Sequence, residues 1–63
     1  MSDSLFYITS DDEHALIQLK MYLADNGGLT SFSGKHFIMG QLSEEMAIYI
    51  KLKYQNVYLV KTG

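Results

Sequence analysis

Hydrophobic and polar residues follow two different periods along the chain, and the change of period divides it into expected strands and helices. Leu5 to Thr9 is a short aromatic and β-branched run, which is typical of a strand. Ser10 and Glu13 then have the spacing of a capping box, which predicts a helix start, and Asn26-Gly27-Gly28 supplies a stop. Between them the spacing of three and four predicts one apolar helix face, made of Ala15, Leu16, Leu19, Tyr22 and Leu23 and widened by Ile17, Met21 and Ala24.

The second half of the chain shows the same kinds of pattern. Leu29 to Phe32 and His36 to Met39 flank a tight connection, which predicts a hairpin with Gly34 at a positive φ. Ser43 then has the position of an N-cap before a second helix. Val57 to Val60 is the clearest strand of the chain.

The expected order of elements is therefore β-α-β-β-α-β, in one domain spanning residues 1–63. The two halves also align weakly with each other, pairing Phe6 with Phe37, Glu13 with Glu44, Ile17 with Ile48 and Lys20 with Lys51. This order favours the α+β class and a ferredoxin-like split βαβ domain, with an antiparallel sheet and two helices on one face.

The strands do not alternate cleanly between apolar and polar residues, as strands with one buried face should. If Phe6 and Ile8 point at the helices, Tyr7 points to the open side of the sheet. The last strand places one of two pairs on that side, Val57 with Leu59 or Tyr58 with Val60, and the third strand has His36 and Ile38 on one side with Phe37 and Met39 on the other. We expect the open side to hold tyrosines, aliphatic residues and His36.

The chain has 63 residues, and at this length the apolar residues on the open side of the sheet bear on how the protein is stabilised. A chain of this size buries only about 60% of its unfolded surface, and without cysteine it has no disulfide to add stability. We therefore predict a homodimer, and binding of a different protein through the same apolar face or a strand edge. The candidate partner-binding residues are Tyr7, Phe32, His36, Ile38 and Tyr58.

The charge of the chain argues against two classes of function, nucleic-acid binding and membrane anchoring. All five basic residues are lysines and the net charge is −2, which argues against many phosphate contacts and against a polybasic membrane anchor. Met1 to Ser4 lacks the positive region of a signal peptide and no stretch has the length of a membrane span, so we expect a cytoplasmic protein.

The sequence contains no strong catalytic, cofactor or metal motif. Asp11 to His14 fan around a helix start and do not converge on one ion, while sequence alone places no carboxylate or nucleophile beside His36. We therefore expect a non-enzymatic protein without cofactors. Small acidic chains without catalytic groups are of the kind that bacteriophages and mobile elements use as inhibitors or adaptors of host proteins.

The segment from His36 to Ala47, with its Gly40-Gln41-Leu42-Ser43 turn, and the final strand Asn56 to Val60 resemble the second half of a SPOR domain. That resemblance implies binding of peptidoglycan glycan strands outside the cytoplasmic membrane.

The same order of elements resembles an RNA recognition motif, with Leu5 to Ile8 in place of the first-strand motif and Lys35 to Met39 in place of the third-strand motif. This resemblance implies single-stranded RNA stacked on Tyr7 and Phe37. The second aromatic residue and the glycines of the third-strand motif are absent.

Overall fold

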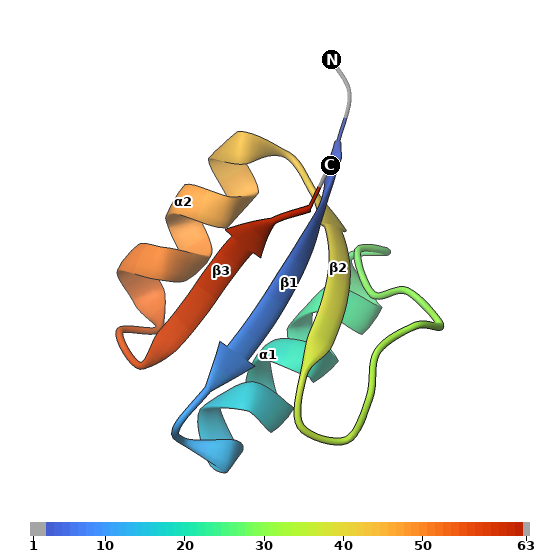
Figure 1. The fold of residues 1–63 in the computed structure, drawn as a ribbon. Coiled ribbons are helices and arrows are strands. Elements are labelled where there is room, and N and C mark those ends of the chain that lie inside the picture. Colours follow the sequence, from blue (N-terminus) through green and yellow to red (C-terminus); the bar gives the residue numbers. More distant parts are fainter. Residues whose placement is uncertain (1–2, 63) are drawn as a thin grey trace.

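The computed structural model describes residues 3–62 and has a three-stranded antiparallel sheet and two helices (Figure 1). The elements are β1 (Ser4–Ser10), α1 (Glu13–Asp25), β2 (Ile38–Leu42), α2 (Glu44–Lys53) and β3 (Val57–Lys61). The strand order is β2-β1-β3, and β1 is antiparallel to both neighbours. The small α+β class is thus confirmed.

The strand β1 sets which side of the sheet is buried. Ile8 pairs with Ile38 on one side and with Leu59 on the other, and Phe6 pairs with Gly40. Because paired residues share a face, these side chains all point at the helices. They join one core that contains residues from both helices: Phe6, Ile8, Leu16, Leu19, Leu23, Ile38, Leu42, Ile50 and Val57. Both helices therefore cover the same face of the sheet.

The expected hairpin between residues 29 and 39 does not form. Leu29 makes only an isolated bridge with Gly40, and β2 begins at Ile38, two residues later than predicted. Side-chain hydroxyls take part in the hydrogen bonding that a strand ladder would provide: Thr30 Oγ1 donates to the Met39 carbonyl at 2.6 Å, and the Met39 amide donates to Ser33 Oγ at 3.0 Å. The expected four-stranded sheet is consequently reduced to three strands.

The backbone conformation of Gly34 also differs from the predicted positive φ. Within residues 3–62, the only glycine with a positive φ is Gly27, at 75°. Gly34 is instead required for space, since a Cβ there would lie 2.7 Å from Cζ and 2.9 Å from Cδ1 of Phe37. The loop therefore folds so that the Phe37 ring packs directly onto the Gly34 backbone.

The start of α1 is capped by a different residue from the expected one. Asp12 accepts hydrogen bonds from the amides of His14 at 3.0 Å and Ala15 at 3.4 Å. Ser10 remains the last residue of β1, where its hydroxyl donates to the Asn56 carbonyl at 2.8 Å. The prediction of Ser10 as the cap is wrong because this hydroxyl ties β1 to the turn before β3.

The predicted end of α1 and the predicted start of α2 are confirmed, whereas α2 ends at Lys53, earlier than the end expected at Asn56. Gly27 adopts a left-handed conformation after α1, and the Gly28 amide donates to the Leu23 carbonyl at 2.8 Å, which closes the helix end. Ser43 caps α2 by accepting from the Met46 amide at 3.1 Å.

Candidate interaction surface

The side of the sheet away from the helices carries no charged side chain at its outward strand positions. Because neighbouring residues in a strand alternate between faces, the residues between the buried ones point outward. We call this surface the open face; it consists of Leu5, Tyr7, Thr9, Met39, Gln41, Tyr58 and Val60. Tyr7 is 40% exposed, Tyr58 54% and Val60 57%.

Tyr7 lies at the centre of the open face. It pairs across the sheet with Met39 on β2 and with Val60 on β3. Phe37, just before β2, stacks on its ring with a centroid distance of 5.4 Å and an interplanar angle of 29°. This packing orders the aromatic residues and extends the apolar surface beyond β2.

Tyr58 is held at the border of the open face by a carboxylate. Its hydroxyl donates to Asp11 Oδ2 at 3.1 Å. This hydrogen bond, assisted by the negative charge of Asp11, raises the pKa of Tyr58 above its usual value. This contact ties the Tyr58 side chain on β3 to the turn between β1 and α1.

The strand β3 has one side without a strand partner among residues 3–62. The amide of Thr62 donates to the Leu5 carbonyl at 2.8 Å, which shows that the backbone groups of Thr62 point at β1. Since these groups alternate in an antiparallel pair, the amide and carbonyl groups of Val57, Leu59 and Lys61 point away from β1. We call this row of backbone groups the β3 edge.

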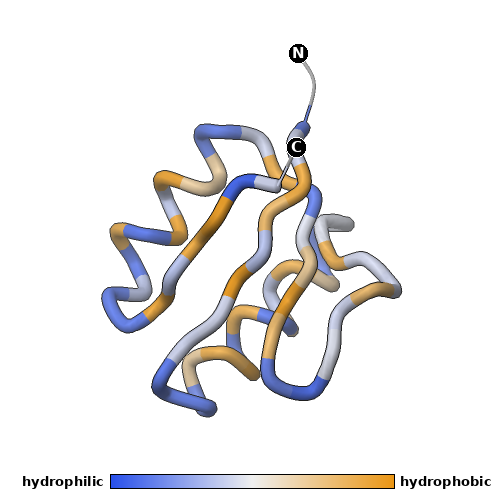
Figure 2. Tube along the Cα trace, in the orientation of Figure 1, coloured by the Kyte–Doolittle hydropathy of each residue, from blue (hydrophilic) through white to orange (hydrophobic). Residues whose placement is uncertain are grey.

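The other side of the sheet is partly closed. Beyond β2, the Thr30 amide donates to the Met39 carbonyl at 3.1 Å and the Gln41 amide donates to the Gly28 carbonyl at 2.7 Å. The β3 edge is thus the more accessible place for an added strand. Figure 2 shows hydrophobic segments along the strands of this sheet.

The structure brings together two of the five predicted partner-binding residues, Tyr7 and Tyr58, on the open face. Phe32 is 74% exposed but lies in the loop before β2. Ile38 was expected on the open side and is instead 0% exposed, because β2 turns this side chain into the core. His36 precedes β2 and is also displaced from the open face.

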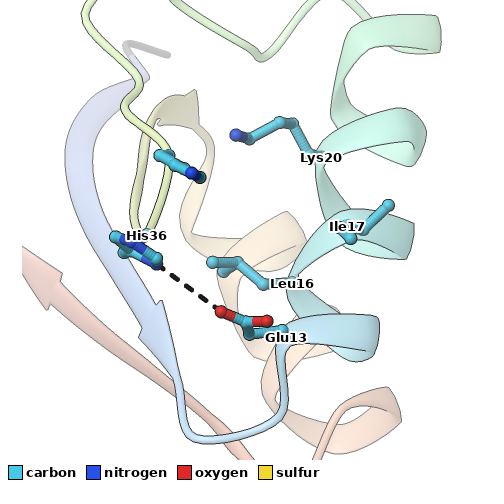
Figure 3. A pocket seen from close by; sticks show the side chains of 6 residues that line it. Glu13, Leu16, Ile17, Lys20 and His36 are labelled. Atoms are coloured by element: carbon cyan, nitrogen blue, oxygen red, sulfur yellow. Dashed lines mark ion pairs between the residues drawn. The ribbon is translucent and has the colours of Figure 1, made fainter.

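His36 lies beside the start of α1 instead. Its Nδ1 atom is 3.7 Å from Oε1 of Glu13, and both side chains are exposed (Figure 3). They line a pocket of about 140 Å³ together with Leu16, Ile17, Lys20 and Lys35. The Lys20 ammonium is engaged, since it donates to the Gly34 carbonyl at 2.7 Å. The pocket therefore joins α1 to the loop before β2.

The helices expose apolar residues that were predicted to widen the core stripe or were not predicted at all. Ile17 on α1 is 57% exposed and Ile48 on α2 is 60% exposed. Met21 and Leu52, each one turn further along, are also exposed. The weak alignment of the two halves pairs Ile17 with Ile48. It is the one feature of the sequence that indicates matching positions for these residues on the two helices.

A cluster of tyrosines lies where α1 meets α2. The rings of Tyr22 and Tyr49 have centroids 6.1 Å apart, and the Lys53 ammonium lies 5.5 to 5.7 Å from the rings of Tyr22, Tyr49 and Tyr54. Hydrogen bonding to Tyr49, followed by smaller effects of the other tyrosines, raises the pKa of Lys53. This arrangement places Tyr49 and Lys53 on the side of α2 nearest α1.

Within residues 3–62, no three His, Asp or Glu side chains come together as a metal-binding group. No helix in this range has the length and apolar character needed to cross a membrane. Comparison with protein-family models, curated proteins and solved structures finds no match to this chain.

Proposed function

We propose that this chain is a small, non-enzymatic interaction protein of the cytoplasm that self-associates and uses its open face to bind another protein. The observation that carries the proposal is the absence of charge at the outward strand positions, combined with exposed Tyr7, Tyr58 and Val60. Tyrosines that are apolar on the ring and polar at the hydroxyl are frequent anchors in protein interfaces.

The size of the molecule supports self-association. A standard interface covers about 800 Å² on each partner. The described chain has a surface of 4350 Å², so such an interface would take about a fifth of it. A second copy would thereby cover apolar surface that the small core leaves exposed.

The open face suits a protein partner better than RNA. Tyr7 and Phe37 stack on each other, so each ring offers only one free side to a base. The outward strand positions also supply no cation for phosphate groups, which dominate nucleic-acid affinity. The protein would then act by occupying a surface of its partner, as an inhibitor or an adaptor.

Affinity capture from a native lysate of the source cells tests the open face. The double variant Tyr7→Ser, Tyr58→Ser removes both anchors, and the double variant Phe32→Ser, Tyr49→Ser removes two exposed aromatic residues elsewhere. We expect a protein band that wild type and control retain and that the open-face variant loses. Equal capture by all three proteins, or a band abolished by ribonuclease, contradicts the proposal.

A further inference from the structure

We infer that a second copy of this chain pairs antiparallel with β3 along the β3 edge, with the two-fold axis at Leu59. This inference rests on the proposed self-association and specifies its geometry. It joins two three-stranded sheets into one sheet of six strands.

The backbone of the β3 edge determines the kind of partner. The outward amide and carbonyl groups of Val57, Leu59 and Lys61 form a row that an extended chain can pair with along its length, in place of water. Pairing about Leu59 lets the two Leu59 residues exchange both of their N–H···O bonds. The strand contains no proline, and its one charged residue, Lys61, lies at its end.

The side chains of β3 are compatible with this register. On the open face, Tyr58 of each copy lies opposite Val60 of the other, an aromatic and β-branched pair of the kind that stabilises antiparallel sheets. On the helix side, Leu59 is only partly buried although it points at the core, so a second Leu59 can cover its remaining surface. The two Lys61 residues lie at opposite ends of the paired strands and do not repel each other closely.

The helix α2 continues the contact. Lys61 Nζ is 3.5 Å from Glu44 Oε1, so these residues lie at the same level of β3 and α2. Two residues back along β3, from Lys61 to Leu59, is about 7 Å, and four residues along α2, from Glu44 to Ile48, is about 6 Å. Ile48 is one turn from Glu44, on the flank of α2 that Tyr49 leaves free by facing α1. The exposed Ile48 side chain thus lies level with the two-fold axis.

Charge on α2 favours this arrangement. The helix carries Glu44 and Glu45 in its first turn and Lys51 and Lys53 in its last turn. Glu44 and Lys51 are seven residues apart and so lie on the same flank. Two antiparallel copies of α2 therefore bring Glu44 of each near Lys51 of the other. The same packing places two open faces side by side as one larger surface for a partner protein.

Sedimentation velocity from micromolar to millimolar concentration, on a chain synthesised with an N-methyl group on the Leu59 amide, tests the edge. This change removes the outward N–H and keeps the side chain and the bonds between β3 and β1. We expect the wild-type chain to dimerise, and the methylated chain to have a dissociation constant raised about a hundredfold because both central bonds are lost. Unchanged dimerisation of the methylated chain contradicts the inference.

A matched pair of variants tests the helix contact without changing the strand. Ile48→Asp places a carboxylate level with the axis, whereas Ile17→Asp makes the same change at an equally exposed position of α1. We expect the first to raise the dissociation constant about tenfold and the second by less than about twofold. Equal effects of the two variants overturn the proposed geometry, and they do so even if the methylated chain fails to fold.

The results separate the inference from the proposed function. If the double variant Tyr7→Ser, Tyr58→Ser dissociates the dimer while Leu59 methylation and Ile48→Asp do not, the two copies join through the open face and the edge inference is wrong. A wild-type chain that stays monomeric at millimolar concentration refutes self-association itself. If Leu59 methylation dissociates the dimer and the methylated chain still captures the partner through Tyr7 and Tyr58, the result agrees with both the edge inference and the proposed function.

Discussion

Replacing Ile38 by alanine distinguishes a core residue from a surface residue at the position where sequence and structure differ most. Ile38 is 0% exposed and pairs with Ile8 in the middle of the sheet. The change removes three carbon atoms, worth about 2.4 kcal/mol in transfer free energy, and leaves a cavity that raises the cost to about 3–4 kcal/mol. A domain of 63 residues has a free energy of unfolding of about 3–9 kcal/mol, so Ile38→Ala should remove about a third of it or more.

Urea denaturation followed by circular dichroism measures this effect, at a concentration where the protein is monomeric. Val60→Thr is the matched control, because it keeps a β-branched side chain at an exposed strand position and should change the free energy of unfolding by about 0.5 kcal/mol or less. A loss below about 1 kcal/mol for Ile38→Ala, with partner capture abolished, would refute the assignment of Ile38 to the core.

Three further predictions follow from local contacts. Ser43→Ala should lower the free energy of unfolding by about 1 kcal/mol through loss of the α2 cap, and a change below about 0.3 kcal/mol in urea denaturation would contradict the capping role. Gly34→Ala should displace the Phe37 ring, so that its NOEs to the stacked tyrosine disappear; their persistence would show that the loop accommodates a Cβ. Asp11→Asn should lower the pKa of Tyr58 in an ultraviolet titration, and an unchanged pKa would contradict the hydrogen bond as its cause. Because the pKa of Tyr58 is raised in the folded state, the contribution of this contact to stability is present below the ordinary tyrosine pKa and is lost as pH rises through the raised one.

The parts of the fold that follow from periodicity were predictable. The extended run around Tyr7, the amphipathic stretch ending at Gly27 and the run from Val57 to Val60 became β1, α1 and β3 because local preference and burial agree there. Tyr7 was predicted to face away from the helices for the same reason, since side chains in a strand alternate.

The segment from Leu29 to Phe37 could not be predicted in this way. Its pattern suits a strand, but the hydroxyls of Thr30 and Ser33 bind the Met39 backbone and stop the ladder after one bridge. Ile38 was predicted on the open side together with His36, because the two share one strand face and the run from His36 to Met39 does not show which of its faces is buried. The exposed positions of Ile17 and Ile48 likewise depend on tertiary packing, since a helical stripe does not state how wide its buried part is.

Isotope-filtered NMR on a mixture of differently labelled copies detects contacts only between two molecules, and so distinguishes pairing along the β3 edge from packing of two open faces. We expect intermolecular NOEs between the Tyr58 ring of one copy and the Val60 methyl groups of the other, and none between the two Tyr7 rings. NOEs between Tyr7 rings, or the absence of intermolecular NOEs at millimolar concentration, would contradict pairing along the β3 edge.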